Sequence, residues 1–363
     1  MLNNKTKYKQ IWHISRKCKM PTNNKKHHFK LSANEKELLR QELSLISYNN
    51  DNSKNQIEKL RKIAYKTFPD SLIEKLESLK GNDSSYCIFD NLPIDTVTGS
   101  PIDQPPTFDI KNGNLTEILL LTFGAIIAEP YSISFEGSNI VNNLIPCQAA
   151  KLEYTGLGSE VELDFHIENA AQIYDSQGDT SPLALLLIGV RKDPNVKSPK
   201  TLIADSRKAL EQMSPSEINT LYAKEFFIKK PFRWRTAQPL EENPPVAILS
   251  GPLEHPRVAA AFYADMVTPI NEKAEKAYNA FKKQIKLISK SVEIKPGRLV
   301  FINNRFTLHA REKFQATYDA NNTPYRWVQR IFITNNLWAF RHFKECGNRI
   351  FDPSQTDNTK KSV

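Results

Sequence analysis

The spacing of hydrophobic positions changes about one third of the way along the chain. Before that point, apolar residues recur every three to four positions, the spacing of amphipathic helices. This spacing predicts helices that begin after Ser32 and that cover about 55–67 and 70–81. Ser32 opens a Ser-x-x-Glu capping box. The continuous apolar run 116–128 predicts a further, buried helix.

Short apolar or alternating runs between turn residues dominate the rest of the chain and predict strands. These runs are 149–154, 161–166, 183–190, 201–204, 225–229, 246–250, 298–302 and 327–333. Two helices are predicted among them, one from the capping box at Ser214 with Pro215 at its first position, and one over 272–289. The pattern therefore predicts a mainly β, α+β protein with helices first and further helices inserted into an antiparallel β body.

The domain organisation follows from the same pattern. Residues 1–31 are polar and lack periodicity, which predicts a flexible tail. We expect one domain over 32–345, with a helical part at 32–130 and a β core at 131–345. Residues 346–363 lose the pattern and are predicted to be a polar C-terminal tail.

The net charge of +10 belongs mostly to the first tail. Residues 1–30 contain nine Lys or Arg and no Asp or Glu, so the remainder is close to +1. A basic tail can bind nucleic acid or an anionic membrane, but it is more often a solvated end. We expect no nucleic-acid partner.

Hydrophobic content of 40% and charged content of 25% are typical of globular proteins. The longest apolar stretch, 118–128, is too short to span a bilayer, and no apolar secretory segment follows the basic N-terminus. The four cysteines, at positions 18, 87, 147 and 346, form no CxxC pair. Free thiols in a reducing cytoplasm are the expected state. The sequence carries no signal for an oligomeric state.

Metal-binding chemistry is first indicated by His166 and Glu168, at the end of the alternating run 161–166. Alternate residues of a strand share a face, so the imidazole and the carboxylate can converge on one ion. A second imidazole would complete a 2-His-1-carboxylate triad that leaves positions open for O2 chemistry at Fe(II). The alternative is a solvated pair at the end of a surface strand.

A second segment, PGRLVFINNRFTLH at 296–309, supplies a further histidine, His309, and is followed by RWVQR at 326–330. Arg326 and Arg330 are four apart and share a face if the segment is a strand. Two inward guanidinium groups need anionic partners. A dicarboxylate co-substrate and a substrate carboxylate would supply them. The alternative is an arginine ladder that faces solvent.

The order of these motifs over residues 115–345 resembles the clavaminate synthase-like branch of the 2-oxoglutarate oxygenases, which is similar to the taurine dioxygenase group and includes hydroxylases of free amino acids. The Gly-Leu-Gly-Ser turn at 156–159 also resembles that branch. The resemblance implies a double-stranded β-helix (jelly roll) with helices packed outside. The sequence departs from the branch at Arg298 and Asn303, and Tyr154 stands where a glutamine is frequent.

The resemblance also implies roles for individual residues. His166, Glu168 and His309 match the iron ligands, and Arg326 and Thr201 match the contacts of the distal 2-oxoglutarate carboxylate. The implied substrate contacts are Arg330, which would hold an acidic group, Ser159 and Asp265.

The predicted function is therefore that of an Fe(II)- and 2-oxoglutarate-dependent dioxygenase. It would use O2 to hydroxylate a small molecule, most simply a free amino acid or a derivative, and release succinate and CO2. Two alternatives stay open, an oxygenase acting on a macromolecular side chain and a catalytically silent jelly-roll binding protein. Deletion of residues 1–31 would separate the amino-acid oxygenase from both alternatives, since unchanged turnover of a free amino acid favours the former and lost binding to a large partner favours the latter.

Overall fold

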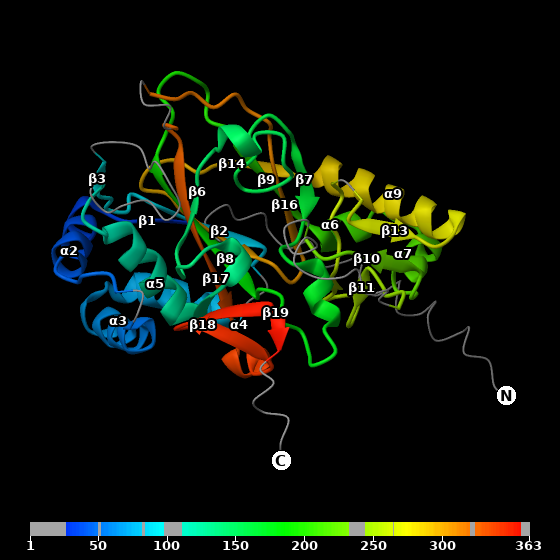
Figure 1. The fold of residues 1–363 in the computed structure, drawn as a ribbon, viewed down its shortest axis with the longest axis horizontal. Coiled ribbons are helices and arrows are strands. Elements are labelled where there is room, and N and C mark those ends of the chain that lie inside the picture. Colours follow the sequence, from blue (N-terminus) through cyan, green and yellow to red (C-terminus); the bar gives the residue numbers. More distant parts are fainter. Residues whose placement is uncertain are drawn as a thin grey trace, which may run out of the picture.

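Two β-sheets lie at the centre of the computed structural model, which describes residues 27–49, 52–81, 84–97, 111–231, 244–263, 265–319 and 324–356 (Figure 1). The larger sheet has the order β1-β2-β15-β8-β17-β5-β19-β18, and β6 also pairs with β17. Its strands are β1 (His28–Lys30), β2 (Tyr86–Asp90), β5 (Glu129–Ile133), β6 (Asn142–Leu144), β8 (Ala184–Arg191), β15 (Leu299–Asn303), β17 (Trp327–Thr334), β18 (Phe343–Gly347) and β19 (Ile350–Thr356).

The smaller sheet has the order β14-β9-β16-β7 and carries most of the chemistry. Its strands are β7 (Leu163–His166), β9 (Lys200–Asp205), β14 (Lys290–Glu293) and β16 (Thr307–Arg311). Three two-stranded pairs lie beside the sheets. They are β3 (Thr96–Val97) with β4 (Lys111–Asn112), β10 (Phe226–Ile228) with β13 (Val267–Pro269), and β11 (Leu249–Ser250) with β12 (Arg257–Val258).

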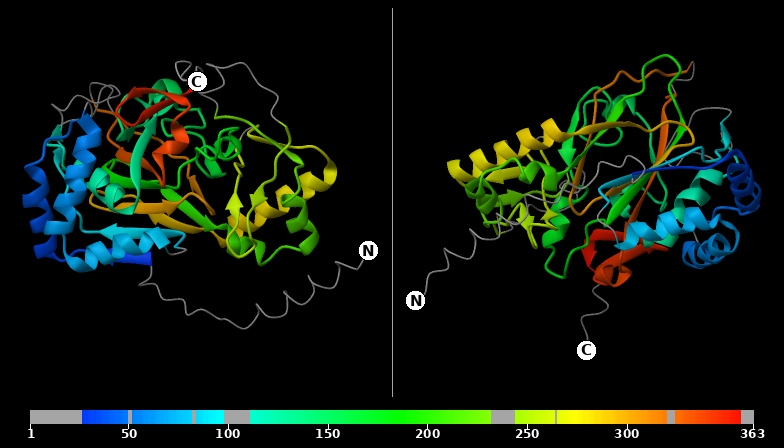
Figure 2. Two further views of the ribbon diagram at one scale, coloured as in Figure 1. Left: turned by 90° about the horizontal axis from the view of Figure 1, so that it is seen from below. Right: turned by 180° about the vertical axis from the view of Figure 1, so that it is seen from behind.

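Helices cover the outer faces of both sheets (Figures 1 and 2). The larger sheet is covered by α2 (Ala33–Ser44), α3 (Ser53–Thr67), α4 (Asp70–Gly81) and α5 (Leu115–Ile127). The smaller sheet is covered by α6 (Ser206–Leu210), α7 (Pro215–Leu221) and α9 (Glu272–Ile288). Short 3₁₀ helices complete the chain: η5 (Ser134–Glu136), η6 (Gln148–Ala150), η7 (Ala170–Tyr174) and η8 (Leu337–Phe340). Among the described residues, no helix is both long and apolar enough to cross a membrane.

Strand alternation decides which residues face the space between the sheets. On β8, Leu186 and Ile188 pack against the N-terminal helices, whereas Leu185 and Leu187 pack toward the smaller sheet. On β16, Leu308 and Ala310 belong to the outer cluster with α9. Because side chains alternate along a strand, His309 and Arg311 face inward between the sheets. One face of β16 therefore points into the space between the two sheets.

The predicted elements agree with the structure in most places. Every predicted helix is present, and the capping boxes at Ser32 and Ser214 form. The jelly-roll core with N-terminal and inserted helices is confirmed. The prediction of a strand over 149–154 is wrong, because the chain there forms η6 and turns.

The predicted tail boundaries also need correction. Residues 1–26 lie outside the described residues, but His28–Lys30 form β1, which pairs in parallel with β2. At the other end, the predicted tail 346–363 contains β19, which pairs with β5 and β18. In both segments a neighbouring strand satisfies the backbone groups, and in β19 Ile350 and Phe351 are also buried in the core. Residues 357–363 lie outside the described residues.

Candidate active site

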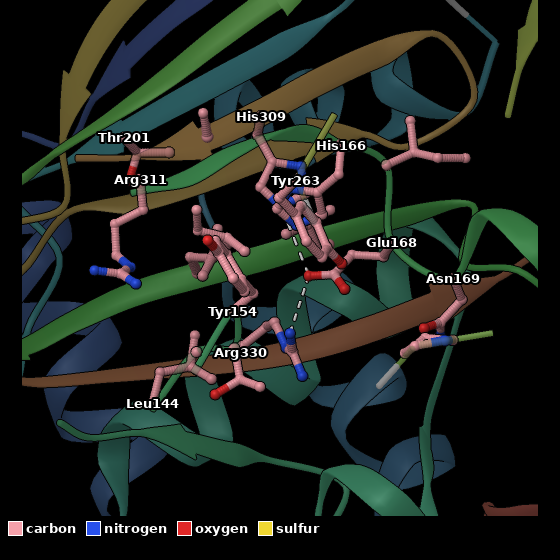
Figure 3. Close-up of a pocket in the computed structure, with 18 of the residues that line it drawn as sticks. Leu144, Tyr154, His166, Glu168, Asn169, Thr201, Tyr263, His309, Arg311 and Arg330 are labelled. Carbon is pink, nitrogen blue, oxygen red and sulfur yellow. Dashed lines mark hydrogen bonds and ion pairs between the residues drawn. The ribbon is translucent and has the colours of Figure 1, made fainter. Parts of the chain in front are cut away.

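Three potential metal ligands lie close together where β7 ends beside β16 in the smaller sheet. His166 ends β7, Glu168 follows two residues later, and His309 on β16 is the direct cross-strand partner of His166. One ligand atom from each residue lies within 4.8 Å of the others. The Nε2 atom of His309 is 3.6 Å from Oε1 of Glu168. The three side chains point into one pocket (Figure 3).

Hydrogen bonds orient the ligands from outside the pocket. Nδ1 of His166 lies 2.9 Å from the carbonyl oxygen of Asp164, which assigns the proton to Nδ1 and leaves Nε2 free to ligate. Asn304 fixes the backbone of Glu168, since its Oδ1 accepts from the Glu168 N–H and its Nδ2 donates to the Glu168 carbonyl. Asn304 was not among the predicted site residues, although it belongs to the 296–309 segment.

The charge states of these groups suit a divalent cation. Burial and the neighbouring His309 lower the pKa of His166 to about 4, so its imidazole is neutral at pH 7. Burial would raise the pKa of Glu168, but the Arg330 guanidinium and His309 outweigh that effect and lower it. Neutral imidazole and ionised carboxylate are the forms that bind metal. Two imidazoles from adjoining strands and one carboxylate from the segment just after β7 fit a 2-His-1-carboxylate iron centre.

One end of the pocket holds two arginines that have no acidic partner among the described residues. Arg326 precedes β17, and Arg311 is the cross-strand partner of Thr201. All three side chains line the pocket. Burial lowers the pKa of Arg311 to about 10, and burial together with Arg311 lowers the pKa of Arg326 to about 10. Within the described residues, neither guanidinium lies within 4.0 Å of a carboxylate.

Arg330 occupies a different environment near the triad. Its Nη1 donates to Oε1 of Glu168 at 3.0 Å and its Nη2 donates to Oε2 of Glu136 at 2.6 Å. Only 5% of Arg330 is exposed. Glu136, on η5, also lines the pocket and was not predicted from the sequence. The predicted inward orientation of Arg326 and Arg330 agrees with these positions.

Two stacked tyrosines form an aromatic wall beside the triad. The rings of Tyr154 and Tyr263 are 5.9 Å apart and nearly parallel, with an interplanar angle of 11°. Tyr263 meets the His166 ring edge-on at 5.2 Å. Both tyrosines line the pocket and lie over the centre of the site in Figure 3.

Two predicted substrate contacts lie outside the pocket lining. Asp265 is largely exposed and pairs with Lys229 at 2.5 Å. Ser159 is buried, and its backbone bonds to Lys151 and Phe314. The structure therefore brings Arg330 to the pocket but neither Ser159 nor Asp265.

The chain has recognisable relatives, although no protein-family model matches it. It is 25% identical to the L-asparagine oxygenase of Streptomyces coelicolor over 247 residues, which cover 68% of this chain and 70% of the relative. It is 27% identical to the enduracididine beta-hydroxylase of Streptomyces hygroscopicus over 276 residues, covering 70% and 78%. It is 23% identical to the L-ornithine/L-arginine 3-hydroxylase of Catenulispora acidiphila, covering 78% and 86%.

Solved structures share the fold over most of the chain. Asparagine oxygenase in complex with Fe(II), 2S,3S-3-hydroxyasparagine and succinate superimposes with a TM-score of 0.77 at 21% identity, covering 90% of this chain and 99% of that one. The non-heme iron oxygenase OrfP in complex with Fe and alpha-ketoglutaric acid gives a TM-score of 0.75 at 19% identity, covering 89% and 99%. The chain therefore shares the fold of these non-heme iron oxygenases over about nine tenths of its length.

Proposed function

We propose that this chain is an Fe(II)- and 2-oxoglutarate-dependent dioxygenase that hydroxylates a free amino acid or a close derivative. The observation that carries the proposal is the convergence of His166, Glu168 and His309 in one pocket with inward-facing arginines. A catalytically silent binding protein would not need both the triad and the arginines. The three relatives named above bear the names of amino-acid oxygenases or hydroxylases.

Each part of the pocket has a distinct task in this proposal. His166, Glu168 and His309 would hold Fe(II), and Arg326 with Thr201 would hold the distal carboxylate of 2-oxoglutarate. When bound, the iron and 2-oxoglutarate would activate O2 for substrate oxidation, with release of succinate and CO2. The buried walls of the pocket hold the reactants in position and limit the access of water.

The α-amino and α-carboxylate groups of an amino acid suit the charges around Arg330. Its guanidinium can take a carboxylate bidentately, as arginine does in many sites. Glu136 and Glu168, which flank Arg330, can accept from an ammonium group. A zwitterion therefore finds a partner for each charge without leaving a buried charge unpaired.

We propose further that the side chain of the substrate is uncharged. In the described part of the pocket, Glu136 and Glu168 are the lining carboxylates, and both already pair with Arg330. Asp265, the predicted partner for a basic side chain, pairs with Lys229 at the surface. The stacked Tyr154 and Tyr263 instead offer a flat, largely apolar surface.

A screen of single free amino acids tests both statements. The protein is supplied with Fe(II), 2-oxoglutarate and O2, and succinate release and the mass of each amino acid are measured. We expect amino acids with uncharged side chains to gain one oxygen atom and to release succinate. Release confined to arginine, ornithine and lysine would contradict the side-chain proposal and leave the oxygenase assignment intact. Turnover of protein side chains alone would favour the macromolecular alternative.

We also propose that the enzyme works in the cytoplasm. Cys87, Cys147 and Cys346 are free thiols, and Cys87 is fully buried. Free thiols are typical of proteins kept in a reducing compartment. Cell fractionation with a specific antibody tests this placement, and recovery of the protein in an extracytoplasmic fraction would contradict it.

A further inference from the structure

Arg311 is a pocket residue to which neither the sequence motifs nor the proposed function assigns a role. It lies two residues after His309 on β16, so both side chains face the space between the sheets. Its cross-strand partner on β9 is Thr201. Figure 3 shows Arg311 and Thr201 at one end of the pocket, with Glu168 toward the other end. Strand geometry therefore places Arg311 beside the expected co-substrate end.

The surroundings of Arg311 leave its charge unbalanced. Its guanidinium meets two backbone carbonyl oxygens at long distances, 3.3 Å for Glu312 and 3.5 Å for Val161. Its Nε is buried and has no hydrogen-bond partner in the part of the chain that the structure describes. No acidic side chain of the described residues pairs with it. A buried donor left without an acceptor is costly unless a ligand supplies one.

Arg326 lies beside the same aromatic ring as Arg311. Both guanidinium groups lie over the ring of Phe314, at 5.3 Å for Arg311 and 5.2 Å for Arg326. Two like charges held together in a partly buried site repel each other and favour a shared anion. A carboxylate has about four lone-pair positions, enough to accept from two guanidinium groups and one hydroxyl.

We propose that Arg311 is a second anchor for the distal carboxylate of 2-oxoglutarate, which it holds together with Arg326 and Thr201. The inference rests on the proposed function and adds a residue to it. Arg330 is the other pocket arginine of the described part, and its two acidic partners at the opposite end make it unsuited to this task. Arg311 would therefore determine affinity for the co-substrate and leave affinity for the amino acid unchanged.

Direct binding, without turnover, provides the first test. The protein is loaded with Mn(II) in place of iron, and 2-oxoglutarate is titrated calorimetrically without oxygen. We expect Arg311→Gln to raise the Kd for 2-oxoglutarate by about 10- to 100-fold, the range for losing hydrogen bonds to a charged group. The Kd for Mn(II) should stay within about twofold of wild type, because Arg311 is not one of the metal ligands and its substitution should not change their energies.

A ligand that lacks the distal carboxylate makes the test specific. 2-Oxovalerate keeps the 2-oxo acid group of 2-oxoglutarate and ends in a methyl group. If Arg311 binds the distal carboxylate, Arg311→Gln should weaken the binding of 2-oxoglutarate strongly and should leave the binding of 2-oxovalerate almost unchanged. Equal weakening of both ligands would overturn the proposal, because it would show a general disturbance of the pocket.

Two further variants complete the design. Arg207→Gln is the matched control, because Arg207 is a partly buried arginine that pairs with Asp205 and does not line the pocket. It should bind both ligands like wild type. Arg311→Lys retains a positive charge without the forked donors, and we expect an intermediate Kd; it also serves if Arg311→Gln does not fold. Wild-type affinity for 2-oxoglutarate in both Arg311 variants would overturn the proposal. If the metal-loaded wild type itself binds no 2-oxoglutarate, the proposed function fails first.

Discussion

Arginine side chains line both ends of the pocket, but they meet different partners there. Arg330 is held by Glu136 and Glu168 at 2.6 and 3.0 Å. Arg311 and Arg326 face the pocket without a carboxylate of the described residues, and burial lowers the pKa of each to about 10. An end that already contains both signs of charge suits a zwitterion. An end that contains positive charge alone suits a carboxylate that arrives with the co-substrate. The two ends of the pocket therefore suit two different ligands.

Loss of the metal should abolish the function of both ends. His309→Ala removes one of the three ligands. Loss of a residue that only hydrogen-bonds to a ligand lowers metal affinity by up to about 100-fold, so loss of the ligand itself should lower it by more. Succinate release should fall to background. His255→Ala, which lies outside the pocket lining, is the control. Full succinate production by His309→Ala would contradict the assignment of the centre.

Removal of Arg326 should affect only the co-substrate end. Arg326→Gln should raise the KM for 2-oxoglutarate by about 10- to 100-fold, because a hydrogen-bonded charge pair is lost. The KM for the amino acid should change little. Steady-state kinetics with each reactant varied in turn measures both values. An increase confined to the KM for the amino acid would contradict this prediction, because it would place the amino acid, and not 2-oxoglutarate, at the end that contains Arg326.

Removal of Arg330 should give the opposite result. Arg330→Gln should raise the KM for the amino acid by about 10-fold or more. It should also destabilise the fold by about 3–5 kcal/mol, because Glu136 and Glu168 lose their buried partner. Urea unfolding and steady-state kinetics measure the two effects, and Arg330→Lys separates charge from geometry. Unchanged stability would show that the pair seen here does not form.

The aromatic wall should contribute less than either charged end. Tyr154→Ala removes the ring that stacks on Tyr263. A stacking contribution of about 0.5–1.5 kcal/mol corresponds to a rise of about 2- to 10-fold in the KM for an uncharged amino acid. The KM for 2-oxoglutarate should not change. Tyr154→Phe keeps the ring and should behave like wild type.

A paired arginine outside the pocket should affect stability alone. Arg298 donates to Asp90, which also meets His28, at 2.7 Å in each case. Burial would raise the pKa of Asp90, but Arg298 and His28 outweigh it and lower the pKa from 3.8. The pair therefore stabilises the fold above about pH 4, and the stabilisation is lost as the pH falls further. Arg298→Gln should cost about 1–2 kcal/mol at pH 7, measured by urea unfolding, and nothing once Asp90 is protonated. A loss that is the same at pH 3 would contradict this account.

Local pattern, together with the family resemblance, was sufficient to single out the three residues that the structure brings together, His166, Glu168 and His309. The i, i+2 rule on a strand placed His166 and Glu168 on one face, and the helices followed from capping boxes and apolar spacing. His309 was predicted by position, although its strand β16 was not, because the polar residues at 303–305 interrupt the apolar run. Arg298, a departure from the family pattern, is explained by Asp90 on the neighbouring strand β2.

Contacts between distant segments set the limit of prediction. Glu136 meets Arg330 across 194 positions, and neither local sequence indicates the other. The family resemblance implied Asp265 as a substrate contact, but only the pairing of β10 with β13 shows that Lys229 lies beside it. Arg311 obeys the same alternation as His309, but the absence of an acidic partner in the described residues appears only once the surrounding strands are in place.

Anaerobic titration of the purified protein with Fe(II) and 2-oxoglutarate tests the central claim most directly. The visible charge-transfer band of the iron–2-oxoglutarate chelate reports the metal site and the co-substrate end together. We predict a band in the wild type that saturates with 2-oxoglutarate and is absent in His309→Ala. A folded, metal-loaded wild type that gives no band would contradict the account, because the pocket would then not hold 2-oxoglutarate on the metal.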